Sequence, residues 1–403
     1  MTDNAISESI LGSSNNISYD VEQVVIERYQ AGAREQQPSL CCPTDYDGKY
    51  LEILPDEIIA KDYGCGDPTR YISTGEVVVD LGSGVGKNCY IIAQKVGENG
   101  KVIGVDFNDE MLSLARKYQR QIGDKLGYQN TQFVKGKIQD LQLDVEQVES
   151  FLEKQPISTI EQFGAFEAEC DRLRQESPLI DDDSVDVVIS NCVLNLVKPS
   201  DKEQLFAEIF RVLKREGRAI ISDIVCDEDP STEILNDADL WSGCIAGAFR
   251  EDQFLKMFED AGFYGVEILT REETPWQVID GIEFRSMTIR AFKGKQGPCW
   301  ERKQSVIYQG PWKQVLDDDG HLLCRGERMA VCDKTYKILT NNQGPYAESI
   351  IGIPPYENIP LDSAAEFNCK GKAIRHPKET KGENYRLTEV KETEDCCSTG
   401  ECC

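Results

Sequence analysis

The chain has 403 residues and carries 71 acidic against 44 basic side chains, which gives a formal net charge of −27. A protein this acidic repels phosphate backbones and anionic lipid heads, so we expect neither nucleic acid nor a membrane as a partner. No apolar run approaches the roughly 20 residues of a membrane helix, and the polar start lacks a secretory signal. We therefore expect a cytoplasmic monomer with two or three domains.

Residues 1–75 are predicted to form an N-terminal arm. The arm contains the vicinal pair Cys41 and Cys42, and it ends near a Gly-Cys-Gly loop centred on Cys65. Glycines on both sides free the backbone of such a loop. Apolar spacing and polarity predict helices over Val21–Tyr29 and Leu51–Ala60 and a loop over Ala31–Gln37.

Residues 76–293 alternate strands with helices, which is typical of a mostly parallel sheet with helices on both faces. We predict seven strands, over Val77–Asp80, Lys101–Asp106, Thr131–Val134, Val185–Ser190, Arg218–Ser222, Val266–Leu269 and Phe284–Phe292. Helices are predicted over Lys87–Val96, Asp109–Gln121, Leu205–Leu213 and Phe254–Ala261. An insertion, residues 144–178, spaces its apolar residues almost helically among charges, so we expect an acidic helical hairpin on the outside.

Residues 294–375 change character and are predicted to form a small β-rich domain. Its Cys299, Cys324 and Cys332 could bind zinc, but we favour simple burial, and we expect Asp317–Asp319 to be a solvated turn. Residues 376–403 are polar and are expected to be a disordered, cysteine-rich tail. The tail ends in Cys396, Cys397, Cys402 and Cys403.

A glycine-rich turn, Gly82-Ser83-Gly84-Val85-Gly86, follows the first strand and its terminal Asp80. Glycines let the backbone approach a ligand closely. The second strand also ends in an acid, Asp106, and a carboxylate there can bind the two hydroxyls of a ribose. The spacing indicates a nucleoside cofactor at the carboxyl ends of a parallel sheet.

The sequence is rich in thiols and poor in imidazoles, with 16 cysteines and two histidines. Cys65, Cys192 and Cys244 interrupt loops at the predicted ligand-facing edge, where loops carry function. Three thiolates suit a soft, three-coordinate ion such as trivalent arsenic, which has no proton to lose and needs no histidine base. The remaining cysteines of this region, Cys89, Cys170 and Cys226, are interpreted as buried and inert.

These pieces together resemble the arsenite S-adenosylmethionine methyltransferases, which are class I, Rossmann-like methyltransferases. The resemblance is carried by Tyr63–Gly66, Asp80–Gly84, Ser190–Leu196 and Trp241–Ala248, and the β-rich C-terminal segment also looks like the family's appended domain. It implies that arsenite is methylated and so detoxified. It implies cofactor contacts from Tyr63, Asp80, Gly82, Ser83, Gly84, Gly86, Asp106, Phe107, Ile138, Gln139 and Asn191.

By the same resemblance, Cys192 and Cys244 bind trivalent arsenic throughout the cycle and Cys65 is the third ligand. Cys65 would also form a disulfide with an arm cysteine when arsenic is reduced, and either Cys41 or Cys42 matches that role. A thiol reductant, glutathione or thioredoxin, is then the implied co-substrate.

Two alternatives stay open at this point. The enzyme could methylate a small organic acceptor, quinone-like or sterol-like, with structural cysteines. The chain could instead be a soft-metal-binding protein that acts through its dithiol tail, although the glycine-rich turn argues against this. The tail could hand arsenite to the core site or be an adventitious chelator.

Overall fold

The computed structural model describes residues 17, 19–37, 40, 44–369, 373–383 and 385. The chain divides into two compact units, with the boundary between Gly294 and Lys295. Cys41, Cys42 and the four tail cysteines lie outside the described residues. Among the helices that the structure describes, none combines the length and the apolar character that spanning a bilayer requires.

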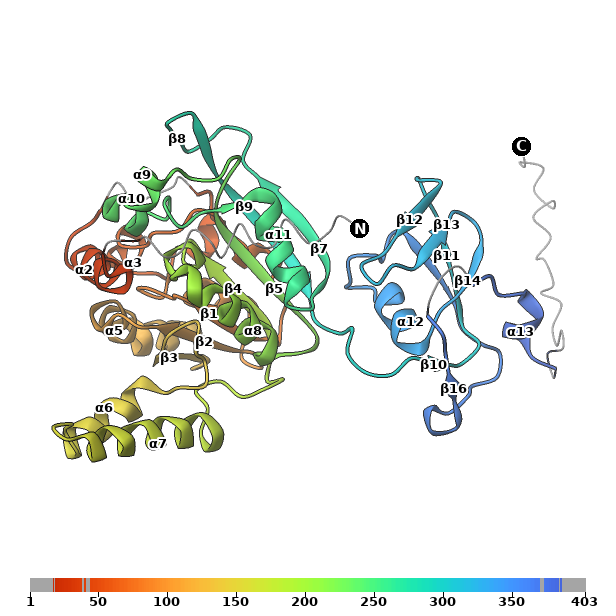
Figure 1. The fold of residues 1–403 in the computed structure, drawn as a ribbon, viewed down its shortest axis with the longest axis horizontal. Helices are drawn as coiled ribbons and strands as arrows, with labels where there is room; N and C mark the ends of the chain where they lie inside the picture. The colour runs from red at the N-terminus through yellow and green to blue at the C-terminus, as the bar shows by residue number, and fades with distance from the viewer. Residues whose placement is uncertain are drawn as a thin grey trace. The chain divides into compact units, whose positions relative to one another are not determined.

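The first unit is built on one mixed sheet with the strand order β3-β2-β1-β4-β5-β9-β7, to which β6 adds beside β5 and β8 beside β9 (Figure 1). Neighbours from β3 through β5 are parallel, whereas β9 runs antiparallel to both β5 and β7. The strands are β1 (Val77–Leu81), β2 (Lys101–Asp106), β3 (Thr131–Lys135), β4 (Val185–Asn191), β5 (Leu213–Cys226), β6 (Phe249–Arg250), β7 (Tyr264–Arg271), β8 (Gln277–Ile279) and β9 (Ile282–Phe292). The strand order reverses direction between β1 and β4, and open parallel sheets bind ligands at such a point.

Each face of this sheet packs against its own layer of helices. The helices of this unit are α2 (Val21–Arg34), α3 (Asp56–Ala60), α4 (Lys87–Val96), α5 (Asp109–Leu126), α8 (Lys202–Val212), α9 (Thr232–Leu235), α10 (Ala238–Ser242) and α11 (Glu251–Asp260). Val78 belongs to the core under α4 and α5, whereas its neighbour Val79 belongs to the core under α8 and α11. This alternation makes a three-layer α/β/α unit, and the predicted fold class is confirmed.

Local differences from the predicted elements have simple causes. Only the second half of the predicted helix Leu51–Ala60 is helical, because Pro55 occupies the N-cap of α3 and the residues before it form turns. The predicted loop after Tyr29 is helical as far as Arg34, because α2 is capped by Asp20 and continues. The strand β8 escaped prediction, although it is joined to β9 by the left-handed pair Asp280-Gly281.

The insertion forms two helices, α6 (Val145–Lys154) and α7 (Ile160–Glu176), which Figure 1 shows side by side. They enclose a small core of their own with Val148, Cys170 and Leu173 buried. Ion pairs from Lys135 to Glu149 (2.5 Å) and from Arg174 to Asp140 (3.0 Å) tie the pair to the main unit.

The described part of the second unit consists of short strands, the α-helices α12 and α13 and the short 3-10 helix Leu361–Ser363. Its elements are β10 (Trp300–Glu301), β11 (Ser305–Tyr308), β12 (Gln314–Leu316), β13 (Leu322–Cys324), β14 (Arg328–Ala330), α12 (Asp333–Thr340), β15 (Ile350–Ile353), β16 (Ala365–Glu366) and α13 (Pro377–Lys381). They pair as β14-β11-β15, β12-β13 and β10-β16. Its core contains Val306, Leu323 and Met329. The helix α13 lies in the segment that was expected to be disordered, and the side chain of His376 caps it.

The aromatic cluster under α8 and α11 offers a test of the packing. Phe258 is fully buried, and its ring lies 4.7 Å from that of Phe206 and 5.4 Å from that of Phe263. We expect Phe258→Ala to lower the free energy of unfolding by about 3–5 kcal/mol, because it removes contacts and leaves a cavity. Urea denaturation measures the change.

The control is Phe163→Ala in α7, where the side chain is 43% exposed and the expected change is within about 0.5 kcal/mol. Equal losses for both variants would contradict the packing described here.

Candidate active site

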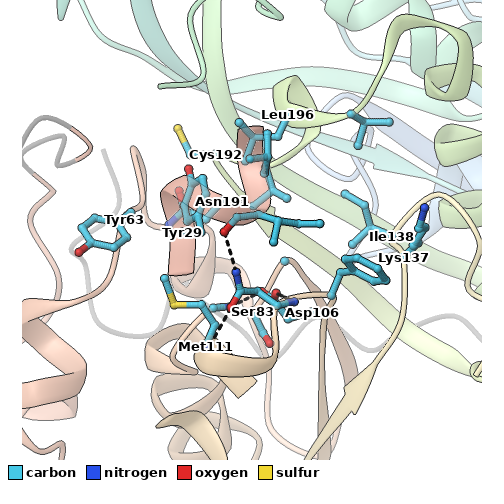
Figure 2. Close-up of a pocket in the computed structure, with 18 of the residues that line it drawn as sticks. Tyr29, Tyr63, Ser83, Asp106, Met111, Lys137, Ile138, Asn191, Cys192 and Leu196 are labelled. Carbon is cyan, nitrogen blue, oxygen red and sulfur yellow. Dashed lines mark hydrogen bonds between the residues drawn. The ribbon is translucent and has the colours of Figure 1, made fainter. Parts of the chain in front are cut away.

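A cavity lies at the carboxyl ends of the parallel strands β1, β2 and β4 (Figure 2). In the figure, Tyr63 and the pair Lys137 and Ile138 stand at opposite sides, with Asn191, Cys192, Ser83 and Asp106 between them. The predicted cofactor residues that line it are Tyr63, Gly82, Ser83, Gly84, Asp106, Phe107, Ile138, Gln139 and Asn191. Asp80 and Gly86 were also predicted to contact the cofactor, and they are not among the lining residues.

The glycine-rich turn forms the floor of this cavity. Gly82 and Gly84 have positive φ angles, and a Cβ on Gly82 would lie 2.5 Å from a methyl carbon of Val193. The hydroxyl of Ser83 is buried without a hydrogen-bond partner among the described residues. Only glycine permits this turn, and the turn carries an unpaired hydroxyl. Such a site fits the polar end of a bound small molecule.

Asp106 is fixed beside this turn. One carboxylate oxygen accepts from the Gly84 N–H and the other from the Asn108 N–H, each at 2.8 Å. Burial raises the pKa of this carboxyl above its ordinary value, although these backbone donors act in the opposite direction. The backbone bonds hold the carboxylate in one orientation at the end of β2, where a ribose binds in sheets of this kind.

Asp80 lies beneath the turn, where its oxygen accepts a 3.2 Å hydrogen bond from the Cys89 thiol of α4. Its side chain is only 2% exposed, and burial raises the pKa of its carboxyl to about 8. Asp62 lies on the cavity wall, and its oxygen is 2.6 Å from the ammonium of Lys87. Asp80 therefore supports the turn from below.

The side chain of Asn191 joins the end of β4 to the loop that carries Cys65. Its Oδ1 accepts from the backbone N–H of Cys65 (2.9 Å) and of Gly66 (3.1 Å), and its Nδ2 donates to the Gly66 carbonyl (2.8 Å). The next residue along the chain is Cys192. One amide thus brings two predicted thiols to the same place.

The glycines beside Cys65 are needed for this close approach, and neither of them has a positive φ angle. A Cβ on Gly64 would lie 2.4 Å from Nδ2 of Asn191, and a Cβ on Gly66 would lie 2.7 Å from the hydroxyl of Ser222. The loop therefore presses onto the ends of β4 and β5 in a way that only glycine allows.

The sulfurs of Cys65 and Cys192 lie within 4.8 Å of each other and of a carboxylate oxygen of Asp223. All three side chains are buried. Asp223 follows Ser222 in β5, and its oxygens accept from the backbone N–H groups of Leu194 and Ile224. Burial raises the pKa of its carboxyl to about 6.

Cys244, the third predicted thiol, adjoins this group without belonging to it. Its thiol donates to the carbonyl of Cys192 at 3.0 Å and lies 3.9 Å from the hydroxyl of Tyr29. Both Cys192 and Cys244 have a φ angle of 64°, which is unusual for a residue with a Cβ. Such strain is found where surrounding structure enforces a functional geometry.

Asn195 enforces the position of the Cys244 segment. Its Nδ2 donates to the carbonyls of Ile224 (2.7 Å) and Cys244 (3.2 Å). A Cβ on Gly247 would lie 2.0 Å from the Asn195 carbonyl oxygen, so this segment also packs against the turn after β4. Lys202 donates to the Gly247 carbonyl at 2.7 Å and completes the support.

Sequence reasoning missed Asp223 and Tyr29. Asp223 could have been found, because it directly follows the predicted strand Arg218–Ser222, and the carboxyl ends of neighbouring parallel strands meet at one edge of a sheet. Tyr29 comes from α2, which folds over the cavity from a distant part of the chain, and its ring lies 6.2 Å from that of Tyr63. The proximity of Cys244 and Cys192 adds to burial in raising the pKa of its phenol.

Comparisons with known proteins indicate the class of enzyme to which this chain belongs. Residues 72–262 match a family described as "Methyltransferase domain", and residues 295–385 match "Domain of unknown function (DUF8838)". An arsenic(III) S-adenosylmethionine methyltransferase from Chlamydomonas reinhardtii has a crystal structure that superposes with a TM-score of 0.50 at 25% identity, covering 83% of this chain and 100% of that one. Together with the sheet order and the glycine-rich turn, these matches define a class I S-adenosylmethionine-dependent methyltransferase.

Two curated relatives show which kinds of methyltransferase this chain is similar to. The arsenite methyltransferase of Aquipseudomonas alcaligenes is 29% identical over 323 residues, which cover 76% of this chain and 82% of the relative. A ubiquinone/menaquinone biosynthesis C-methyltransferase from Cronobacter sakazakii is 27% identical over 218 residues, which cover 48% of this chain and 69% of the relative. The chain is similar to arsenite methyltransferases over about three quarters of its length, which agrees with the resemblance that its motifs indicated.

Asp223 is expected to make the stability of the first unit depend on pH. Its carboxyl pKa is raised by burial from 3.8 to about 6, so the native state holds the proton more tightly than the unfolded state does. The resulting stabilisation is present at low pH and is lost as the pH rises through 6. Through this group, the wild-type protein is expected to lose about 1 kcal/mol of unfolding free energy between about pH 5 and pH 7.5.

Urea denaturation at these two pH values measures the total loss, to which buried Asp80 also contributes, and Asp223→Asn should reduce that loss by about 1 kcal/mol. Exposed Asp227 at the end of the same strand is the matched control, and Asp227→Asn should keep the wild-type dependence. An Asp223→Asn variant with an unchanged pH dependence would overturn the assignment.

Proposed function

We propose that this enzyme methylates trivalent arsenic held by the thiolates of Cys65, Cys192 and Cys244. The observation that carries the proposal is the position of Cys192. It lines the cofactor cavity, and its sulfur lies within 4.8 Å of that of Cys65. An acceptor bound there stands beside the predicted methionine end of the cofactor.

The chemistry of this ligand set suits arsenic. When three thiols condense with arsenite, each thiol proton leaves with an arsenic hydroxide as water, so no separate base is consumed. The bound arsenic keeps a lone pair, which attacks an electrophilic methyl group while the thiolates hold it at reacting distance. The two histidines of the sequence, His321 and His376, both belong to the second unit, which agrees with a step that needs no imidazole base.

Cys244 is proposed to complete the pyramid by a movement of its side chain. Its thiol now donates to the Cys192 carbonyl, and this weak hydrogen bond is exchanged for a bond to arsenic. Asn195 holds the Cys244 carbonyl, so the backbone stays in place while the side chain turns.

The residues of the cavity fit S-adenosylmethionine, which supplies a methyl group on a sulfonium when it is bound. Asp106, Phe107, Ile138 and Gln139 would hold its nucleoside end. At the methionine end we propose contacts from Gly82, Ser83, Gly84 and Asn191, with Asp62 facing the ammonium in place of the buried Asp80. Tyr63, whose hydroxyl donates to the Gly32 carbonyl at 3.0 Å, would flank the cofactor.

We propose that thiols return arsenic to the trivalent state. Methyl transfer uses the lone pair, so formally pentavalent arsenic must gain two electrons before another cycle. Cys65 with Cys41 or Cys42 would supply them by forming a disulfide, and glutathione or thioredoxin would reduce that disulfide. Such reductants place the enzyme in the cytoplasm. We propose a monomer.

Methyl transfer to a small organic acceptor is the weaker alternative. The quinone-pathway relative covers only 48% of this chain. The buried thiols of Cys65 and Cys192 beside the cavity also have no part in such a reaction.

Serine replacements test the ligand set. Cys192→Ser and Cys244→Ser should each lower the rate of arsenite methylation by at least about 100-fold, because a hydroxyl does not replace a soft thiolate ligand. S-adenosylmethionine binding, measured by calorimetry, should survive. Arsenic speciation after incubation with arsenite, cofactor and thiol measures the rate.

The matched control is Cys226→Ser, a buried cysteine of β5 whose sulfur only approaches the Ala248 carbonyl at 3.8 Å. It should retain the wild-type rate. Full activity in Cys192→Ser or Cys244→Ser would remove those residues from the ligand set.

A further inference from the structure

The second unit contains a cluster of thiols that the methyl-transfer chemistry does not use. The sulfurs of Cys299, Cys332 and Cys369 all lie within 4.8 Å of one another. They come from segments that are 33 to 70 residues apart in the sequence (332 − 299 = 33 and 369 − 299 = 70). Cys324, which was considered with Cys299 and Cys332 in the sequence, lies outside the cluster.

Backbone pairing explains how two of these cysteines meet. The strands β10 and β16 are antiparallel, with Trp300 opposite Glu366, and the Cys299 carbonyl accepts from the N–H of Phe367 at 2.8 Å. Cys369 follows two residues later and so lies diagonally across from Cys299.

Cys332 is the N-cap residue of α12. Its sulfur accepts from the backbone N–H of Thr335 at 3.3 Å and lies 3.1 Å from the Thr335 hydroxyl. Helix N-termini and nearby donors stabilise a thiolate, which is the form that binds metals. Burial of Cys332 is complete, so the thiolate faces the other sulfurs.

His321 supplies the second, independent observation. It is 7% exposed, and its Nε2 is buried without a hydrogen-bond partner among the described residues. Its Nδ1 lies 2.7 Å from a carboxylate oxygen of Asp317, which can only accept, so Nδ1 carries the proton and the Nε2 lone pair is left over. A histidine oriented by a carboxylate in this way is the usual arrangement behind a metal ligand.

His321 lies outside the group of sulfurs within 4.8 Å of one another, but it shares a cavity with two of the three thiols. Cys299, Cys369 and His321 line this cavity together with Lys295, Asp319, Gly320, Lys334 and Thr335. Three thiolates and a neutral imidazole around a divalent ion carry a net charge of −1. Lys334 on the wall offsets that charge, whereas Lys295 pairs with Asp319 at 3.3 Å.

We propose that the second unit holds a structural zinc ion bound by Cys299, Cys332, Cys369 and His321. Zinc binds three thiolates and one imidazole in closed tetrahedral sites, and binding would release the three thiol protons. The orphan Nε2 favours zinc over trivalent arsenic, because arsenic takes three sulfurs and needs no fourth ligand. The ion would tie β10, β16, α12 and the β12-β13 hairpin together, and this role is independent of the methyl-transfer site.

Metal analysis of the full-length protein tests this proposal. The background variant replaces the four tail cysteines by serine, which removes adventitious chelation. It should contain about one zinc per chain. Cys299→Ser and Cys369→Ser should each lose most of the zinc, and Asp317→Asn should weaken zinc affinity about 10–100-fold.

Two matched controls locate the metal. Cys324→Ser in the same unit and Cys192→Ser in the methyltransferase unit should both retain the zinc. Loss of zinc in Cys192→Ser alone would move the metal to the other unit and overturn the proposal. So would a wild-type protein without zinc, or thiols of the cluster occupied by arsenic instead.

A cobalt-substituted wild-type protein gives a readout that does not depend on the folding of a variant. Tetrahedral cobalt with three thiolates and one imidazole shows thiolate-to-cobalt charge-transfer bands and intense visible bands. His321→Ala should change these bands and keep the charge transfer. An octahedral spectrum, or one that His321→Ala leaves unchanged, would contradict the ligand set.

Discussion

The hydrogen bonds of the Asn191 side chain hold the reactive part of this molecule together. One oxygen accepts from two backbone N–H groups of the Cys65 loop, and the adjacent residue in the chain is Cys192. Without this amide, two buried donors would lose their acceptor at a cost of about 1–3 kcal/mol each, and the thiols would separate. The residues on each side of Cys65 must be glycines because these hydrogen bonds bring the Cys65 loop so close to β4 and β5 that a Cβ would clash.

We propose that the two units use thiols in different ways, because different groups surround the thiols in each unit. In the first unit the sulfurs of Cys65 and Cys192 have a carboxylate beside them and a cofactor cavity in front, so an ion bound there can react. In the second unit the cluster shares a cavity with a histidine whose Nε2 has no hydrogen-bond partner among the described residues, which suits a closed site. A count of 16 cysteines alone could not separate a substrate site from a structural one.

Most of the fold could be predicted from the sequence, because β-branched runs that end in acids mark the strands of a parallel sheet. The ranges around Asp80 and Asp106 agree with β1 and β2 within a residue. The contact of Asp80 could not be predicted in the same way. Its place at a strand end was clear, but only the packing of α4 shows that its side chain accepts a hydrogen bond from Cys89, and Asp80 is not among the residues that line the cavity.

Residues that meet only through tertiary structure escaped sequence reasoning. Tyr29 reaches Cys244 because α2 folds over the sheet, and they are 215 positions apart. In the second unit, the sequence favours simple burial of Cys299, Cys324 and Cys332. Strand pairing and a turn bring Cys369 and the unpartnered Nε2 of His321 near two of these cysteines, and no local pattern shows this. Local patterns therefore found the loop thiols that we propose as arsenic ligands, and the structure was needed to find what surrounds them.

The central claim is that three protein thiolates hold the acceptor, and X-ray absorption at the arsenic edge tests it most directly. The sample is full-length, zinc-loaded protein without the tail cysteines and with one equivalent of arsenite. The account predicts three sulfur neighbours and no oxygen, with one sulfur replaced by oxygen in Cys192→Ser. Arsenic that keeps its oxygen neighbours in the wild-type protein, or a spectrum unchanged in Cys192→Ser, would contradict it.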